Sequence, residues 1–393
     1  MAPVPRLRDY QGPAILSYGF RPFFLLGALQ SALAMAIWLF LWFRGAGLPT
    51  AFAPRDWHVH EMLYGFVPAV VTGFLLTAVP NWTGRLPLQG GPLLGLVLVW
   101  MGGRIAVATS ALIGRGAAAA IDVGFLVLIV LFVAREVVAG RNWRNLPVLA
   151  FVTALTLGNV AFHVEAASTG LAEYGTRIGL AAAVALLMMI GGRIIPSFTN
   201  NWLARNNPGR LPVPFGRFDI LCVAAGLVAL LAWCARPMAE ATGAALLAAG
   251  LLHAARLARW AGDRAMRDRL VLILHVAYAF VPAGFLLLGA AAFDLVPETA
   301  GIHAWTGGAI GTMTLAVMSR ATLGHTGRAL AADGPTQAIY GLVLLAAAAR
   351  ICAALVPSAM QGLLLVAGFA WIGAFLGFAL VYGPIVGRPR LRS

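Results

Sequence analysis

The sequence predicts an all-α, polytopic membrane protein, a helical bundle with about twelve transmembrane helices. Of its 393 residues, 61% are hydrophobic and only 11% are charged, whereas a soluble protein carries about 25% charged residues. Apolar runs of roughly 20 residues, each long enough to cross a bilayer as a helix, recur along the whole chain. The short alternating segments of a transmembrane β-barrel are absent. Helices also satisfy their own backbone groups in lipid.

Twelve apolar runs lie between arginine, proline and glycine residues. The first run is too long for the core of a signal peptide and lacks a convincing cleavage site, so we expect it to stay as a membrane helix. No segment resembles a soluble domain. We therefore predict one integral-membrane domain over 1–393, with a short cytoplasmic segment at 1–19 and a short basic cytoplasmic tail at 387–393. The predicted spans are roughly 20–43, 58–80, 92–113, 117–138, 147–167, 175–196, 218–236, 240–260, 268–293, 300–321, 336–356 and 360–384.

The net charge of +14 comes from arginine alone, because the chain has no lysine. The arginines are spread over short loops, which membrane orientation explains better than nucleic acid binding. Both ends of the chain and the loops after even-numbered spans are rich in arginine, whereas the loop around Asp294 and Glu298 has none. The positive-inside rule therefore predicts that both termini are cytoplasmic. The arginines used are Arg6, Arg8, Arg21, Arg85, Arg141, Arg144, Arg205, Arg210, Arg217, Arg264, Arg267, Arg269, Arg328, Arg388, Arg390 and Arg392.

The cysteines offer no cofactor motif. Cys222, Cys234 and Cys352 all lie inside apolar runs, and neither CxxC nor the CxxCH of covalent haem attachment occurs. We interpret them as buried structural thiols.

Four of the seven histidines are predicted to lie near the outer face. His58 and His60 begin the second span, His163 is near the end of the fifth, and His303 begins the tenth. Ionisable residues at membrane depth are costly and usually face a bundle interior, and imidazole is a good ligand for haem iron and copper. We therefore predict that His60, His163 and His303 bind a metal or haem, with His58 as a candidate copper ligand. The alternative is that each is an interfacial histidine solvated by water.

Three residues near these histidines are candidate catalytic proton carriers. His60 and Tyr64 are four residues apart and share a helix face, which places a phenol beside the candidate ligand. Glu61 could orient an imidazole or relay protons, or it could simply favour the N-terminal dipole of its helix. Glu165 lies two residues from His163.

Other polar residues lie within the predicted spans. His253 and His275 are on neighbouring spans at similar depth and could bracket a second haem, although a hydrogen-bonded packing role is the alternative. Asp122 and Arg350 are interpreted as a structural polar pair or as part of a proton route.

Two glycines follow His303 at intervals of four residues, Gly307 and Gly311. One helix face below the histidine therefore lacks side chains, and a flat porphyrin could lie there. The alternative is the close helix packing that is typical of GxxxG.

Three segments resemble the signature blocks of the NnrS family: "WHVHEMLYGFVPAVVTGFLLTAVPNWTGR", "MMIGGRIIPSFTNNW" and "HAWTGGAIGTMTLAVMSRATLGHTGR". The resemblance implies a protein of the bacterial inner membrane that contains haem and copper and is linked to nitric oxide and denitrification. It implies haem b, one or two, with copper as a further candidate, and nitric oxide as the ligand. The family's ligands are not carried over, so the residues above remain physical choices.

The predicted function is a haem protein, with copper as a further candidate cofactor, that holds a histidine-ligated metal near the periplasmic face, binds nitric oxide, and reduces or detoxifies it. Reduction of two NO to N2O and water needs two electrons and two protons, and quinol or a periplasmic carrier is the candidate electron donor. A twelve-span secondary transporter and a membrane assembly factor without redox turnover are the alternatives.

A short segment also recurs in similar form at three places in the sequence. Spans two, six and ten end in "PNWTGR", "PSFTNNW" and "LGHTGR". This spacing of four spans suggests a pseudo-three-fold arrangement of four-helix units.

Overall fold

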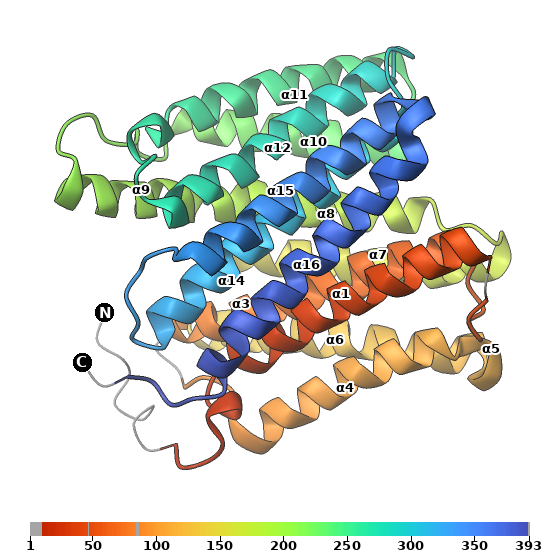
Figure 1. The fold of residues 1–393 in the computed structure, drawn as a ribbon, viewed down its shortest axis with the longest axis horizontal. Helices are drawn as coiled ribbons and strands as arrows, with labels where there is room; N and C mark the ends of the chain where they lie inside the picture. Colours follow the sequence, from red (N-terminus) through yellow and green to blue (C-terminus); the bar gives the residue numbers. More distant parts are fainter. Residues whose placement is uncertain (1–9, 46, 84–85, 392–393) are drawn as a thin grey trace. The chain divides into compact units, whose positions relative to one another are not determined.

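The structure is a computed structural model that describes residues 10–45, 47–83 and 86–391. Within these ranges every regular element is a helix and no strand occurs (Figure 1). The predicted all-α class is therefore confirmed. The longer elements are α1 (Phe20–Arg44), α2 (Pro54–His60), η3 (Glu61–Phe66), α3 (Val67–Thr83), α4 (Gly90–Ala108), α5 (Ser110–Ile113), α6 (Arg115–Ala139), α7 (Leu146–Ser168), α8 (Tyr174–Leu186), η5 (Leu187–Gly191), α9 (Gly192–Asn206), α10 (Arg217–Ala235), α11 (Glu240–Ala258), α12 (Arg269–Ala291), α13 (Glu298–His303), η7 (Ala304–Gly311), α14 (Thr312–His325), α15 (Gly334–Leu355) and α16 (Met360–Val386). Single turns of 3₁₀-helix are η2 (Ala14–Leu16), η4 (Trp143–Asn145), η6 (Gly262–Arg264) and η8 (Pro357–Ala359).

Eleven helices among the described residues are long and apolar enough to cross a membrane. They match eleven of the twelve predicted spans, and the chain is a multi-pass membrane protein. The tenth predicted span is also helical, over Glu298–His325, but it falls outside the eleven. Glycine, threonine and serine residues and Arg320 reduce its hydropathy, so this crossing is the most polar of the twelve predicted.

Three of the long helices contain a π-helical segment: η3, η5 and η7. These segments lie in the second, sixth and tenth predicted spans. A π-helix bonds i to i+5 and is typical of functional sites. The sixth helix also runs on to Asn206, ten residues past its predicted end, and Pro196 lies inside α9 instead of ending the helix.

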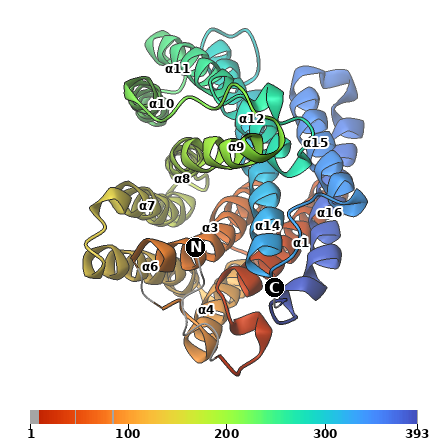
Figure 2. The ribbon, with the colours of Figure 1, turned by 90° about the vertical axis from the view of Figure 1, so that its left-hand side faces the viewer.

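The helices divide between two compact units. Unit 1 comprises residues 1–182, 321–328 and 375–393, and unit 2 comprises 183–320 and 329–374. In unit 1, α4 and α7 flank α6, while in unit 2, α10 and α12 flank α11 (Figure 2). The prediction of a single integral-membrane domain stays a prediction.

The core of each unit is rich in aromatic side chains. Phe23, Phe24 and Phe162 are fully buried in unit 1, and Trp233 and Trp305 are buried in unit 2. Such rings fill the space between helices that meet through small residues elsewhere.

Only one of the three cysteines is buried as predicted. Cys222 is buried, but Cys234 is half-buried and Cys352 is exposed, because an apolar run also has a lipid-facing side.

Four of the arginines on which the predicted orientation depends lie outside the described residues, as do parts of the predicted terminal segments. These arginines are Arg6, Arg8, Arg85 and Arg392. The cytoplasmic placement of both termini stays a prediction.

Candidate metal centre

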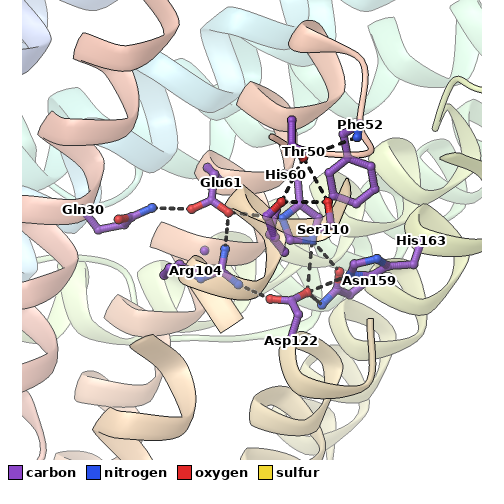
Figure 3. A network of polar contacts seen from close by, with 12 residues as sticks. Gln30, Thr50, Phe52, His60, Glu61, Arg104, Ser110, Asp122, Asn159 and His163 are labelled. Atoms are coloured by element: carbon purple, nitrogen blue, oxygen red, sulfur yellow. Dashed lines mark hydrogen bonds and ion pairs between the residues drawn. The ribbon is translucent and has the colours of Figure 1, made fainter. Parts of the chain in front are cut away.

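A buried polar cluster lies in unit 1, where several helices begin or end (Figure 3). His60 is the last residue of α2, and Arg104 is near the end of α4. Asp122 lies two turns into α6, and Asn159 and His163 share one face near the end of α7. We call this group the Asp122 cluster; its members are His60, Glu61, Arg104, Asp122, Asn159 and His163.

The carboxylate of Asp122 is at the centre of the cluster. Its Oδ2 lies 3.1 Å from Nε2 of His60 and 3.0 Å from Nε2 of His163. The Asn159 amide donates to the same oxygen at 2.8 Å and places its own Oδ1 3.0 Å from Nε2 of His60. The other carboxylate oxygen, Oδ1, accepts from Arg104. Four side chains from three further helices thus fix the orientation of this carboxylate.

Glu61 supplies a second buried carboxylate. Nη1 of Arg104 donates to its Oε1 at 2.7 Å, and the Gln30 amide donates to its Oε2. Two carboxylates therefore share one guanidinium, and with neutral imidazoles the cluster has a net charge of −1. Because a buried charge is costly unless it is compensated, this charge favours either a proton on an imidazole or a bound cation.

Aromatic rings cover the imidazole of His60, which has no exposed surface. The ring centroids of Phe52 and Phe162 lie 5.3 and 5.2 Å from that of His60. Phe52 belongs to the loop before α2, which Thr50 holds by donating to the carbonyl of Val107 at 2.9 Å. These rings keep water away from the polar cluster.

Three members of the cluster could hold a metal ion. His60, Asp122 and His163 each offer one ligand atom, and these atoms lie within 4.8 Å of one another. Metal–ligand bonds of about 2.0–2.2 Å place neighbouring donors about 3.0–3.4 Å apart, close to the two distances around Asp122. Two imidazoles and a carboxylate are the donor set of non-haem iron sites, and imidazole also suits copper and zinc.

The structure brings two of the four predicted histidine ligands together, His60 and His163. The ring of His58 instead stacks on Trp38, with centroids 4.6 Å apart. His303 lies in unit 2, where its Nδ1 is 3.1 Å from Oγ1 of Thr306.

The predicted proton carriers have different surroundings. Glu61 is in the cluster, and the ring of Tyr64 lies 5.5 Å from that of His60, although its hydroxyl donates to the carbonyl of Gly175 at 2.6 Å. The carboxylate of Glu165 accepts from the amides of Tyr174 and Gly175 at 3.1 and 2.7 Å. It therefore caps the N-terminus of α8, where a negative charge is stabilising.

Packing covers the two glycines that were predicted to lie against a porphyrin. A Cβ on Gly311 would lie 2.5 Å from the ring of Trp371, and a Cβ on Gly307 would lie 3.7 Å from Cα of Ala347. Close helix packing, the alternative, describes both positions.

His253 and His275 contact different residues of unit 2. Nδ1 of His253 lies 2.9 Å from the Tyr278 hydroxyl, and Nε2 of His275 lies 2.8 Å from Oγ1 of Thr199. Each imidazole thus has its own hydrogen-bonding partner, as in the packing alternative.

The interpretation of Asp122 needs a correction. Its ion pairs are with His60, Arg104 and His163, all in unit 1, and not with Arg350, which belongs to unit 2. Arg104 and Asn159 belong to the cluster but were not predicted from the sequence. Both are polar side chains inside a predicted span, the same feature by which Asp122 was singled out, so this feature could have found them.

The fold and the cluster define a class: a polytopic helical membrane protein with a buried His/Asp/His group that could hold a metal. The chain belongs to the NnrS family, whose family model, described as NnrS protein, matches residues 14–390. The family resemblance of the three sequence blocks is thereby confirmed. No curated protein matches the chain significantly.

Proposed function

We propose that the chain binds a transition-metal ion at His60, Asp122 and His163, and that this centre binds nitric oxide. The net negative charge buried beside two imidazoles supports the metal most directly. Membership of the NnrS family supports copper as the metal and nitric oxide as the ligand, because both follow from the resemblance. Bound copper or non-haem iron supplies an open coordination position for a small ligand.

The surrounding residues have separate tasks in this proposal. Arg104 and Asn159 hold Asp122 in the orientation that both imidazoles face. Phe52 and Phe162 exclude water, which favours a small neutral ligand such as nitric oxide over solvent.

Haem does not fit between the same donors. The rings of Phe52, Phe162, Tyr64 and His163 all have their centroids within 5.5 Å of that of His60. A porphyrin plane at this imidazole would overlap them. Haem b, one or two, therefore stays a separate prediction, for which a Soret band in the purified protein is the measurement.

Reduction of nitric oxide is the stronger form of this proposal. One quinol supplies the two electrons and two protons that convert two NO to N2O and water, and a periplasmic carrier with separate proton uptake is the other donor class. Glu61 is the predicted proton carrier within the cluster. Formation of N2O by purified protein with quinol and NO is the measurement of turnover.

Metal analysis of purified full-length protein tests the metal centre. We expect His163→Ala and Asp122→Asn to lose the bound metal and its spectral response to anaerobic NO, because each removes one of three donors. His58→Ala is the matched control and should retain both, since its ring stacks on Trp38. Full metal content in the first two variants would contradict the proposal.

Transport is the second candidate function. Three long helices contain a π-helical segment, a local departure from α-helical geometry of the kind found at functional sites, which in membrane carriers include substrate sites. Metal uptake into sealed vesicles by the wild type, without N2O formation, would favour transport. An assembly factor would show neither.

A further inference from the structure

Three arginines of unit 1 gather where the first membrane helix begins and the last one ends. Arg21 lies in the first turn of α1, Arg328 follows the end of α14, and Arg390 lies beyond the end of α16. The amide of Leu391 donates to the carbonyl of Thr326 at 3.0 Å, so the C-terminal segment lies along the end of α14. We call the three arginines the Arg21 group.

Arg21 is a buried cation, with only 3% of its surface exposed. Its Nη1 donates to the carbonyls of Val386 and Arg388 at 2.6 and 2.7 Å, whereas its Nε is buried and has no hydrogen-bond partner. Among residues 10–45, 47–83 and 86–391, no carboxylate forms an ion pair with a member of the Arg21 group. The carbonyls accept hydrogen bonds but carry no net charge. A buried cation without an anion is costly, so this position favours a bound anion.

The charges of the Arg21 group reinforce one another. Arg328 is close enough to Arg21 for their charges to repel, and Arg21 and Arg390 both repel a positive charge on the ring of His325. The C-terminal ends of α14 and α16 offer about −0.5 charge each, so about two of the three positive charges remain uncompensated. A phosphate group carries about one to two negative charges at pH 7. Its charge therefore matches the excess.

The donors beside the Arg21 group also suit phosphate. A guanidinium presents parallel N–H donors that match the oxygens of a phosphate group. Tyr18 adds a hydroxyl: its ring stacks on that of His325, with centroids 5.8 Å apart. Burial raises the pKa of the Tyr18 phenol, and Arg390 opposes this effect only in part. The hydroxyl is therefore protonated at neutral pH and can donate.

We propose that Arg21, Arg328 and Arg390 form a binding site for a phosphate group. Two sources share this chemistry, the headgroup of an anionic phospholipid and the free phosphate ion. The site lies at the ends of membrane helices, and basic pockets in such places bind anionic headgroups. Arg390 is exposed and Arg328 is half-buried, so a ligand at the membrane surface can reach the group. The site does not depend on the function proposed for the Asp122 cluster.

Native mass spectrometry of purified, delipidated full-length protein tests the lipid source. We expect phosphatidylglycerol to bind about 10-fold more tightly than phosphatidylcholine, whose choline group cancels the charge of its phosphate. Arg328→Gln and Arg390→Gln should each weaken phosphatidylglycerol binding by about 5-fold, as expected for one basic residue near an anionic headgroup. Arg21→Gln should weaken it by about 10-fold or more, because its contact is desolvated. Arg135→Gln, which removes an exposed arginine of α6, is the matched control and should bind as the wild type does.

Thermal unfolding in detergent with added inorganic phosphate tests the free ion. An anion that binds only the folded state raises the Tm, so phosphate should raise it above the value in chloride at equal ionic strength. Arg390→Gln should lose this rise. A response to phosphatidylglycerol alone would assign the site to the headgroup, and a response to phosphate alone would assign it to the free ion.

Two outcomes would overturn the proposal. One is a wild type that responds neither to phosphatidylglycerol nor to phosphate, and the other is wild-type binding in both Arg328→Gln and Arg390→Gln. Arg21→Gln also removes two hydrogen bonds to the end of α16. An equal fall in its Tm with and without ligand would give Arg21 a purely structural role and remove it from the site. Because Arg390 is exposed, Arg390→Gln decides the question even where Arg21→Gln does not fold.

Discussion

Arg104 connects the two buried carboxylates of unit 1. Its Nη1 pairs with Glu61 and its Nη2 with Asp122, residues from two different spans. A buried ion pair adds little net stability compared with apolar side chains, but breaking one leaves an uncompensated charge. Arg104 therefore matters most for balancing the charge of both carboxylates and for holding their orientation.

We expect Arg104→Met to destabilise the protein by about 3–5 kcal/mol, because two buried carboxylates lose their partner. Asp263→Asn is the matched control at an exposed pair, Arg210–Asp263, whose side chains are 55% and 63% exposed. Its cost should not exceed about 1 kcal/mol. Unfolding by denaturant in detergent measures both. Equal effects of the two variants would show that the Arg104 pairs are not desolvated.

For single residues, the sequence predicts which side chains belong to a polar site better than it predicts which side chains pair with one another. His60 and His163 could be predicted as site residues because an ionisable side chain at membrane depth is costly and usually has a polar partner or a function. Arg104 and Asn159 lie inside predicted apolar spans, and nothing in those spans marked them as part of a site. Asp122 was paired with Arg350 in the prediction, whereas its partners are His60, Arg104 and His163. Pairing depends on which helix faces meet, and apolar runs without a polar stripe do not encode that.

One π-helical segment lies at the Asp122 cluster. His60 immediately precedes η3, and Glu61 is its first residue. Spans two, six and ten, whose ends are similar in sequence, each contain a π-helical segment: η3, η5 and η7. The span positions could be predicted from hydropathy, but a π-helical turn could not, because it depends on tertiary packing. The pseudo-three-fold arrangement of four-helix units stays a prediction.

Gly65 shows how closely one such segment is packed. A Cβ at this position of η3 would lie 2.5 Å from Nη1 of Arg104. We expect Gly65→Ala to displace the guanidinium, which lowers both the metal content and the free energy of unfolding. Gly95→Ala on α4 is the control, because nothing lies within 4 Å of its Cβ, and it should be neutral or stabilising by up to about 1 kcal/mol. Unchanged metal content in Gly65→Ala would mean that Arg104 does not position Asp122.

The two ends of the membrane domain meet within unit 1. Nη1 of Arg21, at the start of α1, donates to the carbonyls of Val386 and Arg388 at 2.6 and 2.7 Å, at the end of α16. The amide of Leu391 also donates to the carbonyl of Thr326 at 3.0 Å. The first helix therefore begins at the membrane face where the last one ends, and an even number of crossings follows. Eleven apolar spans satisfy this only if the polar helix Glu298–His325 is the twelfth.

Reporter fusions to the full-length chain test this whole-molecule topology. We expect green fluorescent protein at either terminus to fluoresce and alkaline phosphatase at the C-terminus to be inactive, because the arginine-rich loops predict a cytoplasmic location for both ends. Termini on opposite faces would mean an odd number of crossings, so that Glu298–His325 would not span the bilayer. Both termini outside would preserve the twelve crossings but reverse the arginine assignment. Since the hydrogen bonds of Arg21 require only that the ends share a face, the first outcome contradicts the structure and the second contradicts the charge rule.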